Sequence, residues 1–134
     1  MRALVDTGAL LALAWSGDQH HTEATRIVRR HRAAGGRLVG SVLVLGEFYS
    51  HALYAKGPVT ARRLLTGVLG DRAYEWLDVP ASLVVTAGGW LDRFADQTFS
   101  LVDAVSFEIM RRERLTHAFA FDRHFEVAGF ERLR

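Results

Sequence analysis

The sequence has no cysteine, and this absence excludes two kinds of structure. Disulfide bonds cannot form, and no metal site can be built on thiolates, so any metal ion must be held by oxygen atoms or imidazole nitrogens. Long hydrophobic runs are also missing: Asp6 interrupts the apolar N-terminus, and no run approaches the roughly eighteen residues of a membrane span. We therefore expect neither a signal peptide nor a membrane helix, and hence a cytoplasmic protein.

Lysine is almost absent, so the basic character of the chain comes from arginine. Lys56 is the only lysine among 17 Lys and Arg residues, and the isoelectric point is about 9.5. The formal net charge of +2 is a mild bias towards polyanions and identifies none of them. A length of 134 residues with 49% hydrophobic residues predicts one globular domain over residues 1–134.

Short apolar segments alternate with longer segments of helical character. Proline is scarce: only Pro58 and Pro80 occur, and each predicts the beginning of a helix. The expected strands are residues 3–5, 37–40, 74–79, 118–121 and 129–133. The expected helices are residues 9–15, 20–34, 42–55, 58–69, 81–94 and 101–114. This alternation predicts an α/β fold, a three-layer α/β/α sandwich with a central parallel sheet of about five strands.

The stretch from residue 99 to residue 125 carries the most informative pattern. Ser100 and Asp103 have the spacing of a helix capping box, which predicts a helix that begins after Ser100. An apolar stripe at helical spacing follows, formed by Val102, Val105 and Ile109. The apolar run 118–121 then ends at Asp122. Because helix N-termini and strand C-termini of an open parallel sheet lie along the same edge, we expect Asp103 and Asp122 to face one crevice.

Two further acids belong to the same edge of the expected sheet. Asp6 ends the first strand, and Glu47 lies early in the helix that follows the second strand. Hard divalent cations such as Mg²⁺ or Mn²⁺ prefer carboxylate oxygens, with water completing the coordination. A cation held in this way can activate water and stabilise the charge on a phosphoryl group. The four acids therefore predict a site for metal-assisted phosphoryl chemistry.

Each acid also has a purely structural interpretation. Asp6 could cap the helix that follows it, and Asp103 could be no more than the acid of the capping box. Glu47 could pair with His51 one helical turn away, and Asp122 could cap the turn at residues 123–125. We favour a single site, because otherwise four acids with unrelated structural roles would all lie at the same edge of the sheet by coincidence.

Four segments together resemble a PIN domain, and the similarity is closest to the VapC-type toxins of bacterial toxin–antitoxin pairs. These segments are residues 4–13, 41–48, 100–107 and 121–125, so the resemblance extends over nearly the whole chain. It implies a Mg²⁺-dependent (or Mn²⁺-dependent) endoribonuclease with a central parallel sheet. It also implies a homodimer and a small antitoxin whose C-terminal segment covers the acid crevice.

The resemblance assigns roles to individual residues. Its catalytic acids are Asp6, Glu47, Asp103 and Asp122. Asp6, Asp103 and Asp122 would hold the metal, whereas Glu47 would share it or orient the attacking water. Thr7 and Ser100 would supply supporting hydroxyl groups. Two further residues stay open: His124 could contact the substrate, and Asp96 could support the acids from a second layer.

Several functions compete with an RNA-cleaving toxin. A housekeeping RNA-processing nuclease would have the same acids and no antitoxin, and a small gene immediately upstream would separate the two. A catalytically silent RNA-binding module is a further alternative, although an intact set of four acids argues against it. A phospho-accepting receiver domain also gathers acids on a parallel sheet, but it needs paired acids after the first strand and a coupled lysine. The only lysine, Lys56, lies in an expected helix.

Overall fold

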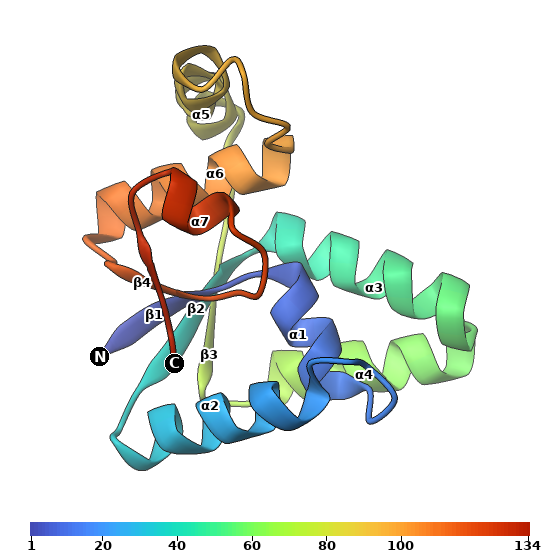
Figure 1. Cartoon of the computed structure of the whole chain (residues 1–134). Helices are drawn as coiled ribbons and strands as arrows, with labels where there is room; N and C mark the ends of the chain where they lie inside the picture. The colour runs from blue at the N-terminus through green and yellow to red at the C-terminus, as the bar shows by residue number, and fades with distance from the viewer.

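Five parallel strands form the central sheet of the computed structural model, which describes residues 1–134 (Figure 1). The strands are β1 (Arg2–Val5), β2 (Arg37–Ser41), β3 (Tyr74–Leu77), β4 (His117–Phe119) and β5 (Glu131–Arg132). Their order across the sheet is β3-β2-β1-β4-β5. The central strand β1 is paired on both sides, since Leu4 lies opposite Val39 of β2 and Ala118 of β4.

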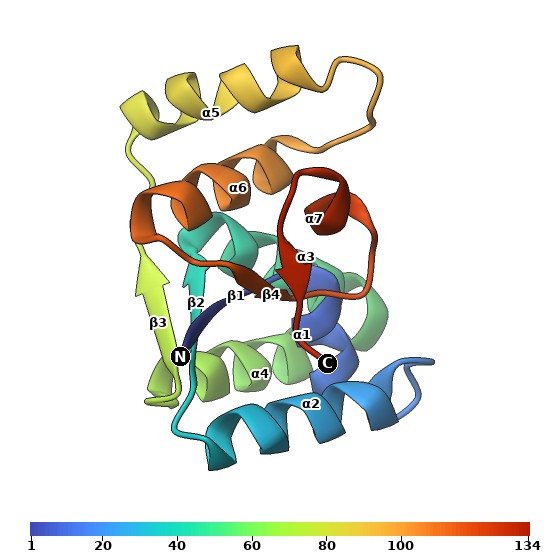
Figure 2. The same cartoon turned by 60° about the vertical axis from the view of Figure 1, so that its left-hand side comes forward.

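Helices cover both faces of this sheet, which confirms the expected three-layer α/β/α sandwich (Figure 2). The helices are α1 (Thr7–Ala14), α2 (His21–Ala33), α3 (Val42–Lys56), α4 (Pro58–Gly70), α5 (Ala81–Arg93), α6 (Leu101–Glu113) and α7 (His124–Val127). The alternation of side chains along β1 divides the core. Ala3 and Val5 pack with residues of α1 to α4, whereas Leu4 packs with residues of α5, α6 and α7.

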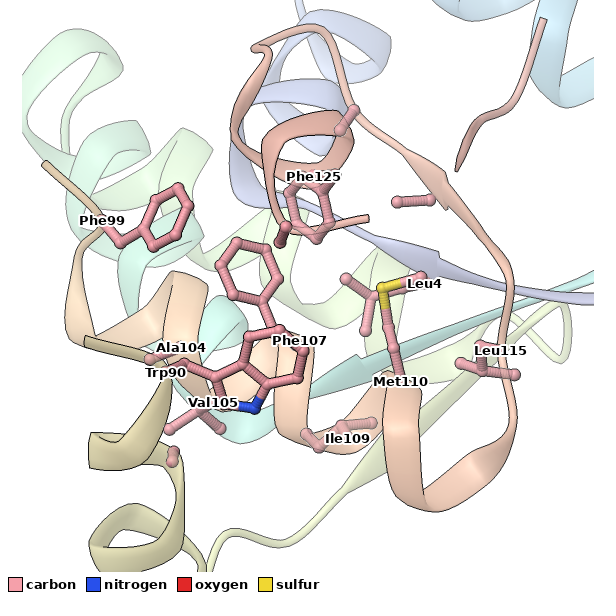
Figure 3. Packing of buried hydrophobic residues seen from close by; sticks show 14 of the residues in the cluster. Leu4, Trp90, Phe99, Ala104, Val105, Phe107, Ile109, Met110, Leu115 and Phe125 are labelled. Carbon is pink, nitrogen blue, oxygen red and sulfur yellow. The ribbon is translucent and has the colours of Figure 1, made fainter. Parts of the chain in front are cut away.

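Aromatic side chains fill the core on the α5–α6–α7 face (Figure 3). The ring of Phe107 on α6 lies at its centre, with ring centroids 5.0 Å from Phe99, 5.1 Å from Phe125 and 5.5 Å from Trp90. Two of these contacts, those to Phe99 and Phe125, are edge-to-face, an arrangement that aromatic pairs prefer. This packing anchors both ends of the segment that carries Asp103 and Asp122, because Phe99 precedes the first acid and Phe125 follows the second.

Helix α6 is buried more completely than a single apolar stripe requires. All eight residues from Asp103 to Met110 are buried, because α6 lies between the sheet and α5 (Figure 2). The stripe predicted for this helix was therefore too narrow. Even Glu108 is enclosed, where the Arg111 and Arg112 guanidinium groups and the Trp90 indole N–H hold the pKa of its carboxyl at about 2.

Local signals placed most helix ends correctly. The Ser41 hydroxyl accepts hydrogen bonds from the backbone N–H groups of Leu43 and Val44, and the capping box of Ser100 and Asp103 is present. The last three strands are shorter than predicted, since β3 ends at Leu77, β4 ends at Phe119 and β5 comprises two residues. The predicted turn after Asp122 leads into the short helix α7. No helix is both long enough and apolar enough to span a bilayer.

Candidate active site

The carboxyl ends of β1 and β4 are joined at one edge of the sheet, and the candidate acids gather there. The backbone N–H of Asp6 donates to the Phe119 carbonyl (3.0 Å), so the residue that follows β1 is fixed against the end of β4. Helix α3 begins directly after β2, and α6 begins at the capped turn at Ser100. The segments that follow β1, β2 and β4, together with the start of α6, thus direct side chains to one edge of the sheet, as expected for an open parallel sheet.

Asp103 is held from two directions. Its Oδ2 atom accepts a hydrogen bond from the Ser100 backbone N–H (3.0 Å) and lies 3.0 Å from Nδ1 of His124. The Ser100 hydroxyl in turn accepts from the Asp103 backbone N–H (3.0 Å). The capping interpretation of Asp103 is therefore correct, and it occupies only Oδ2: no hydrogen bond from a protein group reaches Oδ1.

Asp122 lies on the exposed side of the crevice, with 47% of its side chain accessible. Its Oδ1 atom accepts a hydrogen bond from the His124 backbone N–H (2.8 Å), which is the turn-capping contact expected from the sequence. Its Oδ2 atom has no hydrogen-bond donor and lies 3.8 Å from Nδ1 of His124. Asp103 and Asp122 thus each keep one carboxylate oxygen without a protein donor.

Asp6 is the most strongly perturbed acid of the group. Its side chain makes no capping hydrogen bond to α1, so the structural interpretation of this residue is wrong. Burial raises the pKa of Asp6 to about 7, with help from the negative charges of Asp122, Asp103 and Glu47, whereas the Thr7 backbone N–H lowers it. Such a shift identifies a carboxylate that the fold holds among other carboxylates, away from water.

Glu47 is linked to the segment after β1 by the hydroxyl group of Thr7, the residue that follows Asp6. The Thr7 hydroxyl donates a hydrogen bond to Oε1 of Glu47 (2.7 Å), and Glu47 is half-buried on α3. The hydrogen bond of Glu47 is with Thr7 and not with His51, which is exposed. The Thr7 hydroxyl therefore contacts one of the four acids, and the supporting role that the resemblance implies for it stays a prediction.

The donor atoms suit a hard divalent cation. Ligand atoms of Asp103, Asp122 and His124 all lie within 4.8 Å of one another, and Asp6 is not a member of that close group. Two carboxylate oxygens without protein donors, beside a third carboxylate whose charge is disfavoured, form a site that a Mg²⁺ or Mn²⁺ ion would neutralise. The residues present fit such an ion.

Comparison with known proteins decides the family. The PIN domain family matches residues 3–131 of the chain. The chain belongs to the PIN domain family. Among curated proteins, this PIN domain is 33% identical to the 23S rRNA-specific endonuclease VapC20 of Mycobacterium tuberculosis over 135 aligned residues, which cover 97% of this chain and 96% of that protein.

Solved structures agree with this assignment. A crystal structure of M. tuberculosis VapC20, described as a toxin that cleaves the sarcin–ricin loop, matches this PIN domain with a TM-score of 0.84 at 31% identity and covers 96% of this chain and 95% of that chain. VapBC2 from Rickettsia felis, bound to a DNA fragment from its promoter, matches with a TM-score of 0.71 at 13% identity over 98% and 97% of the two chains. The second match supports the fold alone. The resemblance on which the sequence interpretation rested is confirmed.

The two residues that the sequence left open have different positions in this PIN domain. His124 contacts both Asp103 and Asp122, although sequence reasoning considered it only as a substrate contact. Asp96 is exposed, and its side chain accepts one hydrogen bond, from the side-chain amide of the neighbouring Gln97 (3.5 Å). The one signal for His124 was its place two residues after Asp122, within the turn that Asp122 caps.

Proposed function

We propose that this PIN domain is a Mg²⁺-dependent endoribonuclease and the toxin of a toxin–antitoxin pair. The observation that carries the proposal is the burial of Asp6 at an edge of the sheet where Asp103, Asp122 and Glu47 lie close enough for their charges to raise its pKa. Three acids from separate parts of the chain thus act on Asp6, as expected for one site. The proposal treats residues 1–134 as one domain that acts in the cytoplasm.

The chain's own residues have distinct tasks in this proposal. Asp6, Asp103 and Asp122 would hold the cation, which would stabilise the negative charge that develops on the phosphodiester during hydrolysis. A proton and a cation compete for Asp6, because its pKa of about 7 lets it carry a proton near neutral pH. Glu47, fixed by the Thr7 hydroxyl, would orient the attacking water.

The chemistry of the donors favours Mg²⁺ or Mn²⁺ over softer metals. No thiolate is available in the chain, and the free donors at the site are carboxylate oxygens. The substrate is RNA, and 23S rRNA is the first RNA to test because VapC20, at 33% identity, is named for cleaving it.

The decisive experiment is cleavage of total RNA by the purified protein, with Mg²⁺ and with EDTA, followed by mapping of new RNA ends. We expect discrete cuts only with Mg²⁺, and we expect Asp103→Asn to lose them by at least about 100-fold because its charge faces the cation. Asp92→Asn on the exposed side of α5 is the matched control and should cut like the wild type. Equal cleavage by wild type and Asp103→Asn would overturn the proposal.

The toxin assignment adds two partners, a cognate antitoxin and a second copy of the chain. Co-expression with the neighbouring small gene should give a complex that no longer cleaves RNA, and light scattering on the free protein should give the mass of a dimer. A monomeric, non-toxic nuclease with no such partner would instead fit the housekeeping alternative. RNA binding without cleavage, in wild type and Asp103→Asn alike, would fit the silent binding module.

A further inference from the structure

His124 lies between two acids that come from different parts of the fold. Asp103 belongs to the first turn of α6, and Asp122 follows β4. The backbone N–H of His124 donates to Oδ1 of Asp122 (2.8 Å), and its Nδ1 lies 3.0 Å from Oδ2 of Asp103. A single residue therefore contacts both carboxylates, one through the main chain and one through the imidazole.

The imidazole is fixed by its surroundings. The ring of Phe99 meets it edge to face, with centroids 5.2 Å apart, and the next residue, Phe125, is fully buried in the aromatic core. Only 30% of the His124 side chain is accessible. A residue held by a core aromatic on one side and a capped turn on the other can hold its hydrogen-bond partners in place.

We propose that His124 is a positioning residue of the metal site, which fixes Asp103 and Asp122 relative to each other so that Oδ1 of Asp103 and Oδ2 of Asp122 stay free for the cation. The inference rests on the proposed function. The imidazole N–H at Nδ1 and the Ser100 backbone N–H both donate to the same oxygen, Oδ2 of Asp103, and so leave Oδ1 free. A hard cation prefers oxygen to imidazole nitrogen, which favours a donor role over direct ligation. Partners of this kind commonly account for 10–100-fold in metal affinity.

Two substitutions separate the hydrogen bond from the packing of the ring. His124→Phe keeps an aromatic ring against Phe99 and removes the donor. His124→Asn removes the ring and keeps an N–H donor one bond beyond Cγ, close to the place of Nδ1. Both keep the backbone N–H that caps Asp122, so His124→Phe tests the donor to Asp103 and His124→Asn tests the packing of the ring against Phe99. His117→Phe, which alters a histidine paired with Glu131 at the other end of β4, is the matched control.

The experiment is a titration of the purified protein with Mn²⁺, in the absence of RNA, read by electron paramagnetic resonance. We expect His124→Phe to bind Mn²⁺ about 10–100-fold more weakly than the wild type, and His124→Asn to bind within a few-fold of it. His117→Phe should bind like the wild type. In RNA cleavage, His124→Phe should need more metal for half-maximal rate, with the KM for RNA unchanged. If circular dichroism shows that His124→Phe does not fold, His124→Gln replaces it. The glutamine amide lies one bond further from the backbone than Nδ1 of histidine, so this variant also lacks a donor at the place of Nδ1.

Three outcomes would overturn the inference. The first is that His124→Phe binds Mn²⁺ as tightly as the wild type, and the second is that His124→Asn loses as much Mn²⁺ affinity as His124→Phe. The third is a ¹⁴N coupling from a directly coordinated nitrogen in the wild-type Mn²⁺ spectrum, which would make His124 a ligand. Asp103→Asn in the same titration separates this failure from that of the proposed function. If wild type binds Mn²⁺ and Asp103→Asn does not, while His124→Phe still does, only the role of His124 is wrong. If wild type binds no Mn²⁺, both proposals fail.

Discussion

Replacing Asp6 with asparagine should stabilise the metal-free protein. The fold raises the pKa of Asp6 from 3.8 to about 7, a change of about three units. At 1.36 kcal/mol for each unit, the charged form costs the folded state on the order of 4 kcal/mol above pH 7. Asp6→Asn keeps the shape of the side chain and removes this charge. Burying the amide takes back part of the gain, so we expect at least about 1 kcal/mol, or about 3 °C in melting temperature.

The sign of the pH dependence follows from the same shift. Between the unfolded pKa near 3.8 and the folded pKa of about 7, the folded state binds a proton that the unfolded state lacks. The stability of the metal-free wild type should therefore fall as pH rises from about 4 to 7, and the advantage of Asp6→Asn should grow over the same range. Near pH 4 the wild type no longer carries the buried charge, so the advantage of Asp6→Asn should be gone and the mutant should melt no higher than the wild type.

Thermal melts at pH 4, 6 and 8, in EDTA and with excess Mg²⁺, test this reasoning. Mg²⁺ at a hundredfold excess over its dissociation constant should stabilise the wild type by about 2.7 kcal/mol at pH 8, and Asp6→Asn by much less. Asp92→Asn, which removes an exposed charge from α5, should show neither effect. A lower melting temperature for Asp6→Asn in EDTA at pH 8, or an undiminished response to Mg²⁺, would refute the account.

Two further predictions concern the scaffold. Glu108→Ala leaves the Trp90 indole N–H without its acceptor and should cost about 2–3 kcal/mol in urea denaturation at pH 7. Because the fold lowers the pKa of Glu108 to about 2, this difference should shrink as pH falls from about 4.5 towards 2; a constant gap would contradict the ion-pair explanation. Gly40→Ala would place a Cβ atom 2.5 Å from the Trp76 ring and should destabilise by about 1–3 kcal/mol. Gly46→Ala meets nothing within 4 Å on α3 and should instead stabilise by about 0.5–1 kcal/mol; equal effects at the two glycines would show that packing is not the cause.

The features that the sequence predicted well depend on neighbouring residues. Ser41 and Ser100 cap helices through contacts within three positions, and the alternation of apolar runs with helices determines a parallel sheet. The convergence of the acids follows from the topology of such a sheet, so Asp6, Glu47, Asp103 and Asp122 could be chosen before any coordinates. Their catalytic roles stay predictions until the variants are measured.

The features that the sequence did not reveal depend on distant contacts. The imidazole of His124 meets Asp103 across 21 positions, and no local pattern marks that pairing. The enclosure of Glu108 arises because α5 covers α6, and a charged residue at helical spacing looks like a solvated one until the covering helix is known. The length of β5 likewise depends on a distant partner, since the strand consists of the two residues that pair with His117 and Ala118 of β4.

The central place of β1 has a consequence for the time at which the protein becomes active. Strand β1 is the first to leave the ribosome, but it cannot pair with β4 until β4, one of the last segments, has been translated. A nascent chain that has emerged only as far as α5 carries Asp6 and Glu47, and neither Asp103 nor Asp122. Such a chain has half of its acids and no completed crevice. If the four acids act together as proposed, a nuclease built in this order would not attack RNA near the ribosome that is making it until synthesis is almost finished.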